Sequence, residues 1–157
     1  DFPREGNGWS YKYARRQWNL VDNKDLDYHF LGEFDREMLE TLQRVNQINN
    51  TRIIEIWHND GDQVLCYMRD SLVFVFNFSP SRSYTDYGFL VPKGSYRVVL
   101  NTDSVAFGGN GLADDSIEHM TVPDPLYAKD QKEWLKLYIP ARSAVVLQLN
   151  GANKRFE

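Results

Sequence analysis

The spacing of apolar residues changes once along this chain of 157 residues, near residue 51. Before that point apolar residues recur every three or four positions, which is the repeat of one face of an α-helix. Beyond it they alternate with polar residues or form short continuous runs, and turn-forming residues separate the runs. Because helices and strands bury apolar residues at different periods, we expect a helical N-terminal part joined to an all-β remainder.

The N-terminal part predicts two helices. Ser10 is placed to cap a short first helix, in which Tyr11, Ala14, Trp18 and Val21 lie at helical spacing. A second, longer helix follows, with charged residues opposite a single apolar stripe. This stripe consists of Leu31, Phe34, Met38, Leu42 and Val45.

The remainder predicts about eight short strands. The Asn-Asp-Gly-Asp segment at residues 59–62 predicts a hairpin turn. Residues 72–78 are almost all apolar, which predicts a central strand covered on both faces. The other runs occupy residues 52–58, 64–68, 84–91, 96–100, 117–122, 134–139 and 144–149. Short strands with turn signals between them predict a mainly β fold, an antiparallel β-sandwich.

Charge, hydropathy and cysteine content indicate which partners and which cellular setting to expect. The formal net charge is -4, which argues against a nucleic-acid partner, because neutralising phosphates needs a surplus of Lys and Arg. No apolar run approaches the roughly 20 residues that span a bilayer, so no membrane partner is expected. Cys66 is the one cysteine, and no signal peptide is visible; we therefore expect a reducing, cytoplasmic setting and an inert buried thiol.

The first predicted helix carries more aromatic surface than one face can bury. Trp9 and Trp18 flank different sides of it. A buried aromatic side chain removes about 150–250 Å² from water, at roughly 25 cal/mol per Å². Leaving both exposed would forgo several kcal/mol, so we expect that another domain covers this helix.

Six segments, in order along the chain, resemble the eukaryotic-type branching enzymes of glycoside hydrolase family 13, which act on 1,4-alpha-glucan (glycogen or starch). They are FPREGNGWSY (2–11), RRQW (15–18), DSLVFVFNF (70–78), GSYRV (94–98), FGG (107–109) and PARSAVV (140–146). Two turn-proximal positions depart from the family pattern: Asp70-Ser71, where an Arg-Gly-Asp turn is common, and Ser79, where a His often stands.

The resemblance implies an architecture that accounts for both parts of the chain. Such enzymes have a central (β/α)₈ barrel followed by a C-terminal antiparallel β-sandwich. Residues 1–50 would be the last loop and two α-helices of a truncated catalytic barrel. Residues 51–157 would be the C-terminal all-β sandwich domain of the alpha-amylase superfamily. The missing barrel would then be the partner that covers the first helix.

The resemblance also implies where the chemistry lies. Family 13 enzymes work by retention, with one carboxylate as nucleophile and a second carboxyl group as general acid. Those residues would lie upstream of Asp1, so we predict no catalytic residue here and no branching activity for this polypeptide alone. Arg4, Asn7 and Trp9 would lie on the last barrel loop, where they are predicted to support a bound alpha-glucan. The alternative is that Arg4 forms an ion pair and Trp9 packs on the barrel.

No metal or other cofactor is predicted. Asp114 and Asp115, near Glu118 and His119, have the pattern of a solvated turn rather than of a metal site. The glycine-rich residues 107–111 lack the Lys-Ser/Thr ending of a phosphate-binding loop, so a turn is expected.

Two other roles stay open for the β-rich part. It is either a stand-alone carbohydrate-binding module or a purely structural domain that shields the barrel, and within the parent enzyme we favour the structural role. A binding module would present exposed aromatic rings on one face. The residues that would supply them are Trp57, Tyr67, Tyr87 and Trp134.

Overall fold

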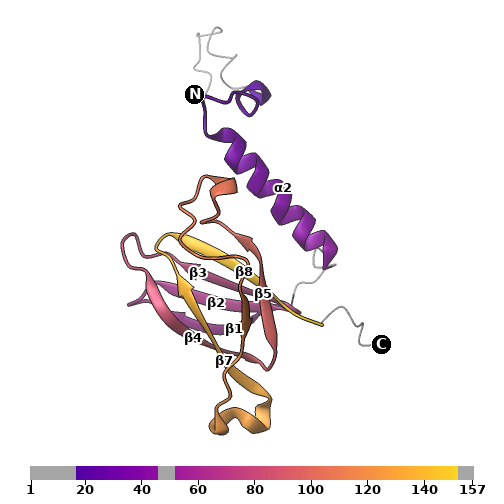
Figure 1. The fold of residues 1–157 in the computed structure, drawn as a ribbon, viewed down its shortest axis with the longest axis vertical. Helices are drawn as coiled ribbons and strands as arrows, with labels where there is room; N and C mark the ends of the chain where they lie inside the picture. The colour runs from indigo at the N-terminus through magenta and orange to yellow at the C-terminus, as the bar shows by residue number, and fades with distance from the viewer. Residues whose placement is uncertain (1–16, 46–51, 152–157) are drawn as a thin grey trace, which may run out of the picture.

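The structure is a computed structural model that describes residues 17–45 and 52–151. Arg4, Asn7 and Trp9 lie outside the described residues. Figure 1 shows a long helix lying against a layered β-structure. The described elements are η2 (Trp18–Leu20), α2 (Tyr28–Arg44), β1 (Ile54–Asn59), β2 (Val64–Arg69), β3 (Leu72–Asn77), β4 (Tyr84–Pro92), β5 (Ser95–Asn101), η3 (Val105–Phe107), β6 (Glu118–Met120), η4 (Pro125–Asp130), β7 (Lys132–Ile139) and β8 (Ser143–Leu149).

The strands form two antiparallel sheets. The larger has the order β1-β2-β3-β8-β5-β6, and the smaller pairs β4 with β7. The hairpin predicted at residues 59–62 joins β1 to β2, and the amide of Asp62 donates to Asn59 Oδ1 at 3.0 Å. The predicted mainly β, antiparallel fold of about eight strands is confirmed.

The core lies between the two sheets. One wall is formed by inward-facing residues of the six-stranded sheet, including Val73 and Val75, and the other by residues of β4 and β7, including Phe89 and Leu135. Successive residues of a strand face opposite sides. Leu72, which alternates with these valines, is therefore buried on the outer face. The prediction that this strand is covered on both faces is confirmed.

Helix α2 supplies that outer cover. Phe34, Met38 and Leu42 of α2, with its C-cap Val45, pack against the outer face of the sheet. They contact the cluster formed by Leu72 of β3, Leu100 of β5 and Val146 of β8. The predicted apolar stripe is therefore satisfied largely by the chain's own sheet, because the outer face of that sheet is apolar as well. Leu31, at the N-terminal end of the stripe, stays 62% exposed.

The glycine-rich segment at residues 107–111 forms the predicted turn and packs against helix α2. Phe107 meets Phe34 of α2 edge-on, with ring centroids 5.5 Å apart. Gly108 ends η3 with φ 77, and a Cβ there would lie 3.0 Å from the ring of Phe30. A glycine thus permits both the left-handed turn and the close approach of α2.

The first predicted helix can be compared with the structure only from residue 17 on, and there the structure differs from the prediction. Only a 3-10 turn, η2, is present at Trp18–Leu20. The chain then turns at Asn23, whose Oδ1 accepts from the amide of Asp25 at 3.0 Å. Trp18 is 69% exposed, so among the described residues nothing encloses this ring.

Candidate functional site

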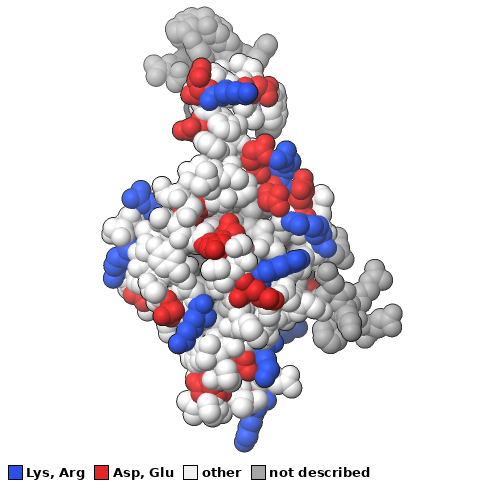
Figure 2. All heavy atoms as spheres, in the orientation of Figure 1, with Lys and Arg blue, Asp and Glu red and all other residues white. Residues whose placement is uncertain are grey.

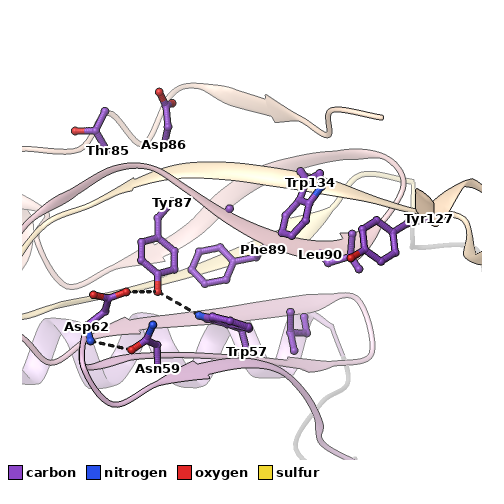
Figure 3. A pocket seen from close by; sticks show the side chains of 12 residues that line it. Trp57, Asn59, Asp62, Thr85, Asp86, Tyr87, Phe89, Leu90, Tyr127 and Trp134 are labelled. Carbon is purple, nitrogen blue, oxygen red and sulfur yellow. Dashed lines mark hydrogen bonds between the residues drawn. The ribbon is translucent and has the colours of Figure 1, made fainter. Parts of the chain in front are cut away.

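An open groove of about 550 Å³ runs between edge strand β1 and the β4–β7 pair. Figure 3 shows Trp57 reaching it from one wall and Tyr87 and Trp134 from the other. Irregular backbone lies on both sides of the groove. Strand β1 shifts register between Glu55 and Trp57, and β4 shifts between Tyr84 and Tyr87. Such bulges re-aim side chains, and here they accompany aromatic rings at the sheet edge.

The first end of the groove is held by a hydrogen-bonded chain of three side chains. The indole N–H of Trp57 donates to the hydroxyl of Tyr87 at 3.2 Å, and that hydroxyl donates to Asp62 Oδ2 at 2.9 Å (Figure 3). Burial raises the pKa of Tyr87, and the Asp62 charge adds to this, so the hydroxyl stays protonated as a donor at neutral pH. The chain fixes both rings relative to the β1–β2 turn.

The second end is built around Trp134. Its indole N–H donates to Asp124 Oδ2 at 2.9 Å, which lowers the pKa of that carboxyl. Tyr127 of η4 meets the indole edge-on, with centroids 5.9 Å apart and planes at 86°. A Cβ at Gly88 would lie 3.2 Å from the Trp134 ring, so the ring lies directly over the β4 backbone. Glycine leaves room for this packing.

Three of the four aromatic residues proposed for a binding module therefore meet at one site. They are Trp57, Tyr87 and Trp134. Tyr67 does not join them, because it lies on the outer face of the larger sheet, stacked on Phe74 at 4.8 Å. The predicted glucan-supporting residues lie outside the described residues and stay predictions.

Sequence reasoning missed the polar residues of the groove and two of its rings, Phe89 and Tyr127. Asp62 has only a turn signal in the sequence, and Tyr127 follows an Asp-Pro pair that indicates a helix start. The Asp124 side chain indeed caps η4 by accepting from the amide of Leu126 at 3.0 Å. The second role of Asp124, accepting a hydrogen bond from the indole of Trp134, becomes visible only in the structure, where η4 packs against β7.

A second feature is the apolar surface that the sandwich leaves uncovered. Four large side chains of the N-terminal segment are more than half exposed, and together they are called the uncovered flank. They are Trp18 (69%), Tyr28 (53%), Leu31 (62%) and Leu39 (51%). An open recess of about 500 Å³ between α2 and η3 adjoins Leu31.

The charged groups form no concentrated site in the described part of the chain. No three His, Cys, Asp or Glu side chains there are grouped to hold a metal ion. Asp114 accepts from Ser116, and Asp115 accepts from Asn101.

Figure 2 shows acidic and basic side chains interspersed over the face in view. Within residues 17–45 and 52–151, no helix is long and apolar enough to cross a membrane.

Fold and site together define an all-β sandwich domain with an aromatic groove between strand β1 and the β4–β7 pair. Residues 55–150 match the family of the alpha amylase C-terminal all-beta domain, and the chain belongs to that family.

The chain is also similar to part of several curated 1,4-alpha-glucan-branching enzymes. It is 43% identical over 150 residues to that of Saccharomyces cerevisiae, covering 95% of this chain and 21% of that protein. The enzymes of Emericella nidulans and Felis catus are 41% and 40% identical over 150 residues, with 95% and 94% of this chain and 22% and 21% of theirs covered. The predicted resemblance to the C-terminal part of branching enzymes is confirmed. The chain spans about a fifth of the length of these curated relatives.

Proposed function

We propose that this chain is the non-catalytic C-terminal part of a 1,4-alpha-glucan branching enzyme. The observation that carries the proposal is the similarity to branching enzymes over about 95% of the chain but only about a fifth of theirs. Such an enzyme cleaves α-1,4 links and re-attaches the released chain through α-1,6 branches. The carboxylates that do this chemistry would lie in the rest of the enzyme, on the catalytic barrel, and the enzyme would be cytoplasmic.

The role proposed for the chain is to pack against the barrel and stabilise it. The uncovered flank supports this role, because exposed side chains such as Trp18 and Leu31 gain about 1.5–3 kcal/mol each when fully buried. Residues 1–50 would contribute the last loop and helices of the barrel, with Arg4, Asn7 and Trp9 near bound glucan. Helix α2 would then lie between two layers, with its stripe on the sandwich and part of its surface toward the barrel.

One expression experiment tests the proposal. The complete reading frame containing this sequence is expressed beside the 157-residue chain, and both are incubated with amylose. Branching is followed by the fall in iodine absorbance and by the appearance of α-1,6 links in the proton NMR spectrum. The complete protein is expected to branch amylose, and the chain alone is expected to leave it unchanged. Branching by the chain alone, or a complete protein without a barrel, would contradict the proposal; the second result would favour a stand-alone carbohydrate-binding module.

A further inference from the structure

We propose that the aromatic groove between β1 and β4–β7 binds a short α-1,4-linked glucose chain. The choice of a neutral polyhydroxy ligand rests on the groove itself, and the choice of glucan among such ligands rests on the proposed function. Of the twelve side chains around the groove that Figure 3 draws, none is Lys or Arg. A phosphate or carboxylate ligand would therefore lack the cationic partner that such groups take.

The groove presents aromatic faces rather than free aromatic donors. Trp57 is 46% exposed although its indole N–H is already bonded to Tyr87, and the N–H of Trp134 is bonded to Asp124. What these rings still offer a ligand is apolar surface. A pyranose ring has an apolar face of C–H groups, and this face suits an amphipathic aromatic wall.

The polar groups of the groove suit a ligand that carries many hydroxyl groups. Asp62 accepts from Tyr87 through one carboxylate oxygen, and Asn59, Thr85 and Asp86 also line the groove. Carboxylate oxygens accept several hydrogen bonds, and sugar hydroxyl groups donate them. A largely apolar recess with a few positioned polar groups is the usual composition of a small-ligand site.

The rings are fixed before any ligand arrives. The hydrogen bonds from Trp57 to Tyr87 and from Tyr87 to Asp62 hold one end, and Tyr127, Gly88 and Asp124 hold Trp134 at the other. A ligand then loses little free energy to ordering of the side chains, which favours affinity.

The groove stays accessible when the uncovered flank is covered. Helix α2 packs on the outer face of the larger sheet, whereas the groove is formed by β4, β7, η4 and the edge strand β1. Figure 1 shows α2 at the opposite side of the domain from β4 and the η4 loop. A barrel docked at α2 would therefore leave the groove open to a long glucan chain.

The test uses the four tryptophans of the full chain as internal reporters. Indole N–H signals are recorded by NMR while maltoheptaose is added to about 10 mM, which detects even millimolar binding. The signals of Trp57 and Trp134 are expected to shift along one saturable curve, and that of Trp18 is expected to stay in place. No shift at Trp57 and Trp134, or an equal shift at Trp18, would overturn the proposal.

Variants and competing ligands sharpen the result. Trp57→Ala is expected to weaken binding by about tenfold or more, because a central aromatic contact carries a large share of binding energy. Trp18→Ala, the matched exposed control, is expected to leave the affinity unchanged. If Trp57→Ala folds poorly, Trp57→Phe replaces it in the test; this variant keeps an aromatic ring and should retain part of the wild-type affinity. Cellohexaose tests the linkage and tetramethylammonium tests a cation site. Binding of either as strong as that of maltoheptaose overturns the assignment to α-1,4-glucan.

The outcome is separable from that of the proposed function. A complete protein that branches amylose while its groove does not bind maltoheptaose removes only the groove proposal. Saturable binding at Trp57 and Trp134 in a protein without branching activity removes only the enzyme proposal.

Discussion

Replacing Tyr87 by Phe should loosen the groove at one defined point. The Tyr87 hydroxyl accepts from Trp57 at 3.2 Å and donates to Asp62 at 2.9 Å, so Tyr87→Phe removes two hydrogen bonds and keeps the ring. Trp57 is 46% exposed and Asp62 is partly exposed, so water can replace the lost hydroxyl at both. Each bond is then worth about 0.5–1.5 kcal/mol, and we expect a loss of about 1–3 kcal/mol in the free energy of unfolding for the two bonds together.

Urea unfolding and NMR measure the two consequences. The urea midpoint should fall with an unchanged denaturant slope, and the thermal midpoint should fall by about 3–9 °C in a domain of this size. The indole N–H signal of Trp57 should also move, because that proton now bonds to water.

Tyr84→Phe is the matched control for this change. Tyr84 lies on the same strand, and its hydroxyl donates to the backbone oxygen of Asp62 at 3.0 Å without a bond to Trp57. Its loss should lower stability by about 0.5–1.5 kcal/mol and leave the Trp57 signal in place. The reasoning is wrong if Tyr87→Phe matches the wild type in stability, or if both variants move the Trp57 signal equally.

Three further changes test other parts of the structure. Asn77→Ala should lower the free energy of unfolding by about 2–4 kcal/mol in urea titration, because the buried amide donates to three backbone oxygens, among them Ile139 O and Pro140 O; a loss below 1 kcal/mol would contradict this. Leu39→Asp should leave the 157-residue chain nearly as stable but lower the thermal midpoint of the complete protein, as followed by differential scanning calorimetry, and equal effects in both would count against the proposed barrel packing. The pKa of Asp124 is lowered in the folded state from its usual 3.8, so the stabilisation that it gives Trp134 is present above pH 3.8 and is lost as pH falls through the folded pKa. Tryptophan fluorescence should show this step, and Asp124→Asn should abolish it; a step that survives in the variant belongs to another group.

The sequence predicted the strands well because each one satisfies its own pattern. Residues 72–78 predict a central strand, and β3 does lie between β2 and β8. Its residues alternate between the core inside the sandwich and the outer face that α2 covers. The helical part was harder. An isolated helix shorter than about 12–15 residues is marginal, so spacing alone did not ensure an α-helix at Trp18, where the described chain forms a 3-10 turn.

The groove could be predicted only in part, because its geometry depends on irregular backbone. The sequence identifies Trp57, Tyr87 and Trp134 as candidate exposed aromatic residues. It does not show which of them share a face, because a bulge interrupts the alternation of side chains along a strand. The register shifts before Trp57 and before Tyr87 change which side chains share a face. The hydrogen bond that Asp62 accepts from Tyr87 could not be predicted for a different reason. It depends on contact between the β1–β2 turn and β4, which are distant in sequence.

The surface of α2 restricts how the proposed barrel could pack against this domain. One side packs on the sheet through residues such as Met38 and Leu42. Another side carries ion pairs between Glu33 and Arg36 and between Glu37 and Arg44, whose side chains are 39–63% exposed. Tyr28 and Leu39 lie about three helical turns apart and therefore share a side, and both are more than half exposed. Since burying charged pairs is costly and burying apolar side chains is favourable, the proposed barrel should approach along the side of Tyr28 and Leu39 and leave the ion pairs in water.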